Sequence, residues 1–294
     1  MYEKVESCPS CHSKDFVNHM ICDDHSVSHE SFAIMKCKNC NLLLTSPRPD
    51  VQSIGAFYKS EDYISHTNQA NSLINRVYKI ARNYTLRNKF QLINRLASKK
   101  SLLDFGSGTG HFLNYVQAKN NWKTIGVEPD EMARTIAISD HDLNVVESLE
   151  DLPDKKFGVI TLWHVLEHIH DLNKTIQTLR KHLSKEGKLV LALPNHLSLD
   201  EQIYKQYWAA YDVPRHLFHF NQLTINQLMQ YNNFSLVETK PMKLDSYYVS
   251  MLSEKHKYGK INYFRSIVNG WKSNNWARKN DNNYSSLIYI FKKA

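Results

Sequence analysis

The chain has 294 residues, of which 42% are hydrophobic and 22% are charged. This composition supplies a sizeable core and excludes a wholly disordered chain. No stretch reaches the roughly 18 consecutive apolar residues of a membrane span. The first ten residues carry Glu3, Lys4 and Glu6 and no apolar run, unlike a signal peptide. We therefore expect a cytoplasmic protein with one large domain and one smaller part.

The formal net charge of +8 is distributed unevenly along the chain. Residues 63–103 hold 8 basic and no acidic side chains, and residues 255–294 hold 9 basic and 1 acidic. The segment between them, 104–254, is acidic, with 14 basic and 19 acidic side chains. This pattern predicts local contact with an anionic partner rather than a protein coated with nucleic acid. Two solvated basic faces are the simpler alternative.

Two cysteine pairs lie near the N-terminus, Cys8-Pro-Ser-Cys11 and Cys37-Lys-Asn-Cys40, separated by 25 residues. Each C-x-x-C turn points two sulfurs at one tetrahedral centre, so the four thiolates predict a structural zinc site. Four protein ligands leave no open position for catalysis. Redox or disulfide cysteines are the alternative, which a cytoplasmic setting disfavours. We interpret residues 1–46 as a zinc-ribbon-like module.

The elements that follow the ribbon predict an α/β protein. Residues 47–100 form a helical linker or lid, since apolar residues from 71 to 98 recur at helical spacing and predict one long helix or two. Strand and helix signals then alternate, with strands expected at 101–105, 124–128, 145–146, 157–162 and 188–193. Such alternation indicates a Rossmann-like, doubly wound parallel sheet over 101–294.

The C-terminal part continues this domain. A helix is expected at 224–231 with Thr224 as its cap, and late strands at 234–239 and 286–291. Between the late strands, residues 241–284 are too long for a plain loop. We predict an insertion with a helix and a mobile surface.

A glycine-rich loop follows the first strand of the alternating region. Its glycines, Gly106, Gly108 and Gly110, have the spacing G-x-G-x-G rather than that of the dinucleotide fingerprint. Asp104 precedes them, and a carboxylate there would repel a pyrophosphate but suits an ammonium group. Glu128 ends the second strand, where an acidic side chain can accept both ribose hydroxyls. A ligand with a ribose and a cationic amino-acid part is S-adenosylmethionine (SAM).

These motifs, in this order, resemble the class I SAM-dependent methyltransferases over about residues 100–240. The segments 103–110 and 126–130 are similar to the first motif and the ribose motif of that family, and 163–168 and 193–195 to its later segments. The family usually has an acidic residue where this chain has Ser148. The resemblance implies cofactor contacts from Asp104, Gly106, Ser107, Gly108, Gly110, Glu128, Pro129, Ser148, Leu149, Trp163 and His164.

With the cysteine ribbon in front, the chain resembles a bacterial subgroup associated with sugar or surface-glycan biosynthesis. The ubiquinone-type O-methyltransferases of the wider class bind a divalent cation through an E-x-x-E-H pattern. The corresponding His164-x-x-Glu167-His168 differs at its first position. Helix capping and packing are therefore favoured there over a second metal site.

Candidate catalytic residues lie in two places. His164 follows the fourth strand, beside the expected methyl position, although a solvent-facing residue at a helix start is the simpler interpretation. The aromatic-rich stretch 208–220 lies at the carboxyl end of the sheet, where open α/β folds bind ligands. We favour His216 as a base or acceptor-orienting group, with His219 beside it and Arg215 as an anion contact. Ordinary packing over the core is an equal alternative.

The leading hypothesis is a SAM-dependent methyltransferase that acts on a small or medium-sized anionic acceptor, such as a nucleotide-linked or lipid-linked sugar. Peripheral membrane contact is compatible with it. One alternative is an RNA or protein methyltransferase that docks through the ribbon. Another is a non-catalytic zinc-ribbon binding protein, which the intact glycines, Asp104 and Glu128 disfavour.

Overall fold

The computed structural model describes residues 1–58, 73–119 and 121–294, and the side chains of these ranges except those of residues 73–81. The chain divides into two compact units. Unit 1 comprises residues 1–60, 166–173 and 192–289, and unit 2 comprises 61–165, 174–191 and 290–294. No helix of the described ranges is long and apolar enough to cross a membrane.

Unit 2 contains the alternating region of the sequence. Its helices and strands are α2 (Leu73–Leu96), β6 (Ser101–Phe105), α3 (His111–Gln117), β7 (Lys123–Val127), α4 (Glu131–His141), β8 (Val145–Val146), the 3-10 helix η2 (Leu149–Asp151), β9 (Phe157–Trp163) and α5 (Leu172–His182), the last of which begins in unit 1. Strand β6 pairs in parallel with both β7 and β9, and β7 pairs in parallel with β8. The expected parallel sheet is confirmed, and the described part of the basic segment contains one helix, α2.

A seven-stranded sheet has the strand order β12-β13-β10-β9-β6-β7-β8. Here β10 is Leu183–Pro194, β12 is Phe234–Pro241 and β13 is Ser286–Lys293. The buried strands are nearly all apolar: every residue of β9 up to Leu162 is buried. Such runs are typical of parallel strands with both faces covered. The order confirms the Rossmann-like fold class.

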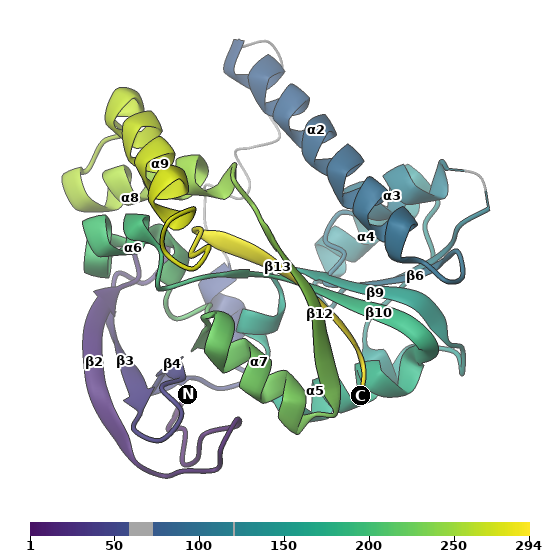
Figure 1. Ribbon diagram of the computed structural model, residues 1–294, viewed down its shortest axis with the longest axis horizontal. Helices are drawn as coiled ribbons and strands as arrows, with labels where there is room; N and C mark the ends of the chain where they lie inside the picture. The colour runs from purple at the N-terminus through teal and green to yellow at the C-terminus, as the bar shows by residue number, and fades with distance from the viewer. Residues whose placement is uncertain (59–72, 120) are drawn as a thin grey trace. The chain divides into compact units, whose positions relative to one another are not determined.

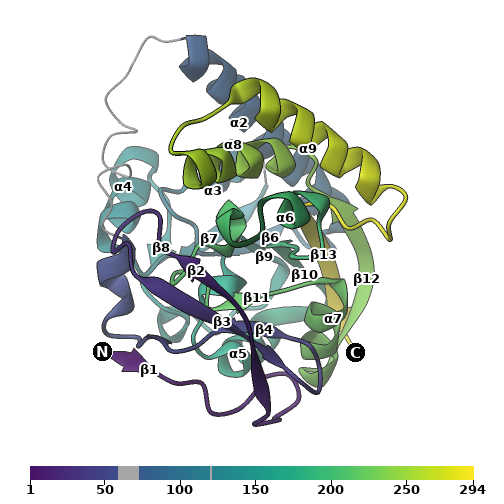
Figure 2. The same cartoon turned by 90° about the vertical axis from the view of Figure 1, so that its left-hand side faces the viewer.

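The N-terminal part of unit 1 is a small antiparallel sheet with the order β11-β4-β3-β2, whose hairpin is clearest in Figure 2. Its strands are β2 (Phe16–Asp23), β3 (Ser31–Cys37), β4 (Leu43–Thr45) and β11 (Phe218–His219). Two short strands, β1 (Tyr2–Glu3) and β5 (Arg48–Pro49), pair separately, and the 3-10 helix η1 (Ile54–Tyr58) follows. The fourth strand of the ribbon sheet therefore comes from more than 170 residues further along the chain.

The remaining helices of unit 1 are η3 (Leu166–His168), α6 (Leu199–Tyr204), η4 (Lys205–Tyr207), η5 (Ala209–Tyr211), α7 (Gln222–Tyr231), α8 (Asp245–Tyr258) and α9 (Tyr263–Ala277). The predicted insertion thus holds two helices, α8 and α9, which lie side by side in Figure 1. The cap of α7 is Asn221, not Thr224. The Asn221 side chain accepts the Thr224 amide at 2.9 Å, and the Thr224 hydroxyl accepts the Asn221 amide at 3.0 Å, which is a capping box.

Candidate functional site

The glycine loop of unit 2 has the backbone that its sequence predicts. Gly106, Gly108 and Gly110 have φ angles of 73°, 54° and 79°, a region that L side chains rarely adopt. A Cβ at Gly106 would lie 2.4 Å from a methyl group of Val165, and one at Gly110 would lie 2.4 Å from Leu143. These two glycines permit close packing. At Gly108 no atom lies within 4 Å of the added Cβ, so this glycine faces open space.

Glu128 holds the open glycine from the neighbouring strand. Its Oε2 accepts the Gly108 amide at 2.7 Å, and its Oε1 accepts the Asp130 amide at 3.0 Å. Burial raises the pKa of this carboxyl above its usual range, while the two amides oppose that shift. The carboxylate is therefore fixed beside the glycine loop. A carboxylate at this position can accept ribose hydroxyls.

Asp104 lies under the loop and is almost fully buried. The Thr161 hydroxyl donates to its Oδ1 at 2.5 Å. Burial raises the pKa of Asp104 to about 7, and the nearby Lys89 ammonium opposes this rise. Lys89, from α2, also lies over the ring of Trp163, with its Nζ 4.3 Å from the ring centroid. Asp104, which we assigned to the ammonium group of the ligand, is thus already close to the cation of Lys89.

Two further polar atoms in this region fit a ligand. The Ser107 hydroxyl and the Trp163 indole nitrogen are buried and have no hydrogen-bond partner among the described residues. Buried polar groups are normally satisfied, so such atoms indicate a missing partner. Together with open space at Gly108 and a fixed Glu128, they fit a nucleoside with an amino-acid tail.

The expected adenine end of the site shows one departure. Ser148 donates its hydroxyl to Asp151 Oδ2 at 2.7 Å, and its amide to the same oxygen at 3.1 Å. Asp151, which the sequence did not single out, thus brings a carboxylate within hydrogen-bond distance of Ser148, where the family usually has an acidic residue. Leu149 is buried at the start of η2. Pro129 follows Glu128 and its carbonyl accepts a hydrogen bond from Arg134 at 3.0 Å.

His164 directly follows β9 and has a φ of 58°. This angle is uncommon for a histidine, so the residue makes a turn at the end of the strand rather than starting a helix. The prediction that it lines the reaction centre stays a prediction. Tyr63 belongs to the segment 47–100, for which we expected a linker or lid, and lies outside the described residues.

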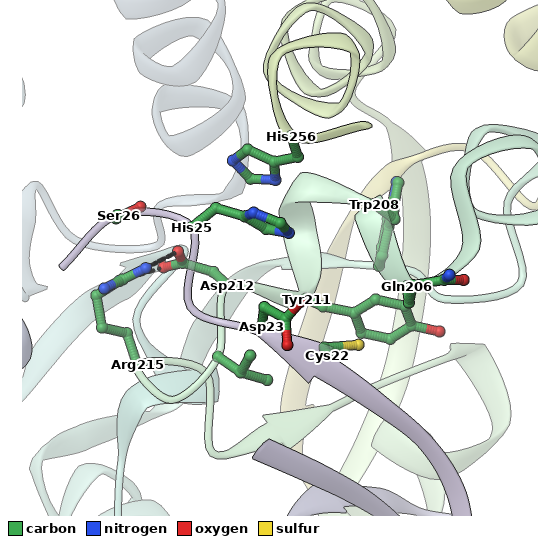
Figure 3. Close-up of a pocket in the computed structure, with 11 residues that line it drawn as sticks. Cys22, Asp23, His25, Ser26, Gln206, Trp208, Tyr211, Asp212, Arg215 and His256 are labelled. Atoms are coloured by element: carbon green, nitrogen blue, oxygen red, sulfur yellow. Dashed lines mark hydrogen bonds and ion pairs between the residues drawn. The ribbon is translucent and has the colours of Figure 1, made fainter. Parts of the chain in front are cut away.

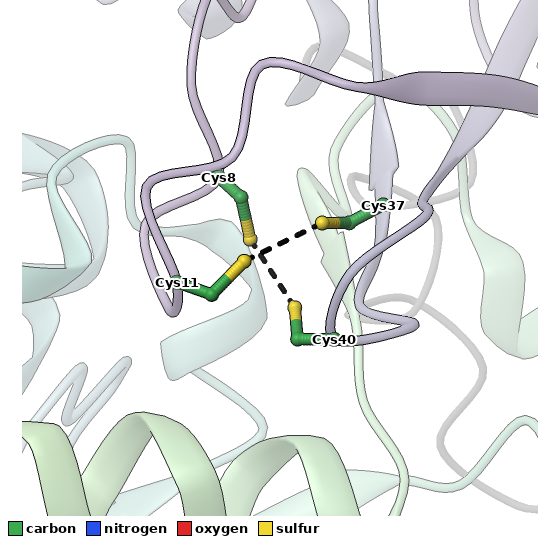
Figure 4. A group of neighbouring side chains, drawn as sticks. All are labelled: Cys8, Cys11, Cys37 and Cys40. Atoms are coloured by element: carbon green, nitrogen blue, oxygen red, sulfur yellow. Dashed lines mark hydrogen bonds between the residues drawn. The ribbon is translucent and has the colours of Figure 1, made fainter.

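The four N-terminal cysteines of unit 1 converge, as Figure 4 shows. Their sulfur atoms all lie within 4.8 Å of one another, with Cys8 3.4 Å from Cys40 and Cys11 3.5 Å from Cys37. Zinc with four bonds of about 2.3 Å needs sulfurs about 3.8 Å apart, so a small expansion accommodates the ion. The donor set and the geometry both fit zinc.

A second cluster in unit 1 contains Glu167, His168 and His216. Glu167 is 1% exposed, and its Oε1 lies 4.0 Å from His216 Nε2. The two imidazole centroids are 4.6 Å apart, with the rings nearly perpendicular. Burial lowers the pKa of His168 to about 4, so this ring is neutral at physiological pH. The cluster offers one carboxylate and two imidazole nitrogens, a set suited to proton transfer or to a cation.

His216 is held by its other ring nitrogen. Nδ1 lies 2.9 Å from the Ala210 carbonyl oxygen, which can only accept, so Nδ1 carries the proton in the neutral ring. Nε2 then has a free lone pair, and it lies 3.9 Å from Asp212 Oδ2 as well as near Glu167. His168 is positioned in the same manner, with Nδ1 3.0 Å from the Arg215 carbonyl and 2.9 Å from the Tyr58 hydroxyl.

Arg215, which we expected to contact an anionic acceptor, is bonded to two carboxylates of unit 1. Figure 3 shows its guanidinium against Asp212, with Nη2 2.6 Å from Oδ1. Its Nη1 and Nη2 also lie 3.2 Å from Asp24 Oδ1, and Nη1 donates to the Phe57 carbonyl. Two carboxylates thus pair with this buried cation, and its contact with an acceptor stays a prediction. Arg215 braces the segment that carries His216.

His219 also has a different place from the one expected. It is 4% exposed on β11, and its Nε2 lies 3.1 Å from the Thr45 hydroxyl. Burial lowers its pKa well below the usual range, so it stays neutral. Trp208 and Tyr211 of the same stretch are buried in the core of unit 1. These three side chains are packed in the interior, whereas His216 has a nitrogen facing two carboxylates.

The sequence did not single out several residues that the structure places at these sites. Lys89 lies on a helix with no motif, Asp151 belongs to a short turn, and Asp24 lies in the N-terminal hairpin. Buried Asp24 accepts the Ser26 and Ser28 amides at 3.0 and 2.8 Å in addition to Arg215. Asp-x-Ser-x-Ser at 24–28 is a local turn signal, but nothing in it predicts an arginine 191 residues away.

Comparison with known proteins agrees with the unit 2 geometry. The Methyltransferase domain family matches residues 78–239. No curated protein matches the chain. A structure from Galdieria sulphuraria, provisionally assigned as a sarcosine dimethylglycine methyltransferase, is 12% identical over 74% of this chain and 88% of that one, with a TM-score of 0.50.

Two further structures show a similar overlap. A SAM-dependent methyltransferase from Archaeoglobus fulgidus is 20% identical over 72% of this chain and 94% of that one, with a TM-score of 0.48. A magnesium protoporphyrin IX methyltransferase from Synechocystis PCC 6803, with bound S-adenosylhomocysteine (SAH), is 13% identical over 78% and 91%, with a TM-score of 0.49. The family match spans more than half of the chain, which therefore belongs to the methyltransferase-domain family and is a SAM-dependent methyltransferase.

Proposed function

We propose that this methyltransferase transfers the methyl group of SAM to a small or medium-sized anionic acceptor in the cytoplasm, such as a nucleotide-linked or lipid-linked sugar. The cofactor part of this proposal rests on one observation. Gly108 faces open space, is held by Glu128 and lies in the loop that follows buried Asp104. When bound, SAM supplies an electrophilic methyl group. The protein then has to bind, orient and desolvate the two reactants.

We assign the cofactor contacts by chemistry. Glu128 would accept the ribose hydroxyls, and the Gly106–Gly110 backbone would approach the amino-acid part. Asp104 would face the ammonium group, and Asp151 with Ser148 would face the adenine amine. Ser107 and Trp163 have buried polar atoms that the ligand would satisfy. Glu128, Asp104 and Asp151 are each already held by a hydrogen bond.

We propose His216 as the general base. Its Nδ1–H is fixed by the Ala210 carbonyl, so Nε2 can take the proton that the acceptor loses as its new bond to carbon forms. The carboxylates of Glu167 and Asp212, 4.0 and 3.9 Å from Nε2, stabilise the resulting imidazolium. His168, with a pKa of about 4, stays neutral beside it and does not compete for the proton.

We further propose that the four cysteines hold a structural zinc ion. The ribbon that it closes contributes β4 to the sheet that β11 completes, with Phe218 opposite Leu44. Thr45 also donates its hydroxyl to the His216 carbonyl at 2.8 Å. The ribbon is therefore part of the support for the catalytic segment. This role favours a positioning function over docking of RNA or protein substrates.

The anionic class of the acceptor rests on charge. Residues 63–103 carry 8 basic and no acidic side chains. Described members of this segment include Arg82, whose Nη1 lies 3.3 Å from His111 Nε2, and Arg87, which is exposed. Arg76 belongs to the same segment, and its side chain lies outside the described residues. A positive segment beside a methyl-transfer domain raises the local concentration of anionic substrates.

The test is transfer of tritium from methyl-labelled SAM to a panel of nucleotide-linked and lipid-linked sugars, with total RNA and a protein extract as competitors. We expect label in a sugar and at least about a hundredfold slower transfer by His216→Asn, with SAH affinity unchanged. The matched control is His29→Asn, an exposed histidine in the same unit. Label that enters only RNA or protein would overturn the proposal of a sugar-type acceptor. Full activity of His216→Asn would overturn the proposal that His216 is the general base.

A further inference from the structure

Helix α9 (Tyr263–Ala277) has its apolar and polar faces reversed relative to an ordinary surface helix. Its solvent-exposed face carries a stripe of large apolar side chains at positions i, i+3 and i+7, preceded by an aromatic neighbour. Their exposed fractions are 80% for Phe264, 57% for Ile267, 59% for Trp271 and 56% for Tyr263. A normal amphipathic helix would direct such a stripe into the core. We refer to these four residues as the α9 stripe.

The buried face of α9 is made of small and polar residues, Ser266, Asn269, Gly270, Ser273, Asn274 and Ala277. Most of their polar side chains form hydrogen bonds inside unit 1. The Ser273 hydroxyl donates to Asp200 at 2.6 Å, and the Asn269 amide donates to the Tyr204 hydroxyl at 2.9 Å. Because the inner face is committed to these bonds, α9 cannot rotate to bury its stripe.

Helix α8 (Asp245–Tyr258) packs against this inner face at close range. The Ser246 hydroxyl donates to the Gly270 carbonyl at 3.1 Å, and a Cβ at Gly270 would lie 2.7 Å from the Tyr247 ring. Small residues that let two helices approach closely, with polar side chains bonded between them, are typical of helices whose outer face meets lipid. Tyr248 and Tyr258 add exposed aromatic surface to the pair.

The sequence that contains the stripe is basic. Residues 255–279 contain seven basic side chains and no acidic one: Lys255, Lys257, Lys260, Arg265, Lys272, Arg278 and Lys279. Arg265 is partly compensated by Glu254, 3.5 Å away. Lys260 precedes the helix by three residues, and Lys272 follows Trp271, so basic groups flank the stripe at both ends. Aromatic and aliphatic side chains flanked by lysines are suited to the interface of an anionic membrane.

We propose that the α9 stripe docks the protein on the surface of an anionic phospholipid bilayer. The stripe enters the boundary between headgroups and acyl chains, and the flanking lysines pair with lipid phosphates. A second copy of the chain fits this face less well, because pairing by a two-fold axis would bring two basic segments together. The inference concerns location and holds whether or not the acceptor is lipid-linked.

The test uses the full-length protein and sucrose-loaded vesicles of phosphatidylcholine with 30% phosphatidylglycerol, at about 50 mM salt. We expect wild type to sediment with these vesicles, to bind pure phosphatidylcholine much less, and to dissociate as salt rises. Phe264→Ser with Trp271→Ser should bind at least about tenfold more weakly. Lys260→Gln with Lys272→Gln should lose roughly thirtyfold, because each lysine near an anionic surface contributes about a fivefold gain in partition.

The matched control is Ile21→Ser with Leu223→Ser, two apolar residues that are each 56% exposed elsewhere in unit 1. This double variant should bind vesicles as wild type does, and all variants should bind SAH normally. Failure of wild type to bind anionic vesicles would overturn the proposal, as would equal binding by the stripe variant. A wild-type dimer in sedimentation equilibrium that Phe264→Ser with Trp271→Ser dissolves would assign the face to self-association instead.

Discussion

The glycine loop of unit 2 and the histidine cluster of unit 1 are built in opposite ways. The loop site takes its main groups from strand ends between Asp104 and Trp163, and the backbone of a parallel sheet places them. The histidine cluster takes Glu167 and His168 from one segment and His216 from another, and groups as distant as Asp24 and Tyr58 help to hold it. Long-range hydrogen bonds, through Arg215 and the ribbon, place these. The first site depends on local backbone geometry, and the second depends on the assembly of unit 1.

This difference has a consequence for perturbation. Changes in the ribbon should affect the histidine cluster, because β11 and Thr45 connect it to the segment that carries His216. They should leave the glycine loop intact, because its hydrogen bonds run among Gly108, Glu128 and Asp130. Ribbon substitutions that damaged the histidine cluster and the glycine loop equally would contradict this distinction between the two sites.

The largest expected effect comes from removing a zinc ligand. Cys37→Ser should abolish zinc binding and cost unit 1 more than about 5 kcal/mol of its free energy of unfolding, because metal binding supplies the folding energy of small ribbons. Zinc content and thermal unfolding measure this, and SAH affinity should stay within about threefold. Cys22→Ala, which changes a cysteine outside the cluster, should retain one zinc per chain. Wild-type protein without zinc would refute this account of the ribbon.

The next prediction compares two glycine variants, to distinguish a loss of ligand access from a cost of backbone strain. Gly108 and Gly259 both have positive φ, 54° and 72°, and both face open space. Alanine at either position should cost roughly 1 kcal/mol of stability. Only Gly108→Ala should also weaken SAH binding, by tenfold or more, because its Cβ would occupy the ligand approach. Equal SAH affinity of the two variants by calorimetry would show that no ligand approaches Gly108.

A smaller effect is the pH dependence of cofactor binding. With a pKa of about 7, Asp104 is mostly protonated at pH 6 and mostly ionised at pH 8. If the ionised form binds the ammonium group, SAH affinity should rise about tenfold over this interval. The free energy of unfolding should move the other way, since a raised pKa stabilises the folded state at low pH and this contribution is lost as pH rises through 7. Asp104→Asn should flatten both profiles, and a persistent slope would assign them to another group.

The smallest effect concerns Lys89. Its ammonium lies over Trp163 and lowers the pKa of Asp104. Lys89→Met should move the midpoint of the SAH pH profile upward, so that affinity at pH 7 falls a few fold while affinity at pH 9 is unchanged. Lys99→Met, an exposed lysine in the same unit, serves as the control. A uniform loss at every pH would indicate a contact with the ligand rather than an effect through Asp104.

Local signals in the sequence predicted most of unit 2. The strand at Ser101–Phe105 has the expected bounds, because a buried apolar run ends at the glycine loop. The four cysteines were predicted for the same reason, since their spacing alone determines the turns. The capping of α7 was assigned to Thr224 although Asn221, three residues earlier, fills that role, because both side chains can accept a backbone amide at a helix start.

Long-range packing explains what the sequence could not predict. The sequence suggested an anion contact at Arg215 because no local feature predicts its hydrogen bond to Asp24. The exposed stripe of α9 was expected only as part of an insertion, because periodicity identifies an apolar face but not whether the protein covers it. His219 and His216 lie three residues apart in one motif, yet one is fixed on a strand and the other faces two carboxylates.

Calorimetry of SAH binding to wild type and Glu128→Ala tests the central claim most directly. We predict a single site in wild type and at least about thirtyfold weaker binding in the variant, because hydrogen bonds to a charged group contribute about 2 kcal/mol. Glu186→Ala, an exposed glutamate in the same unit, should bind as wild type does. Absence of SAH binding by wild type, or equal affinity of Glu128→Ala, would contradict the assignment of the glycine loop as the cofactor site.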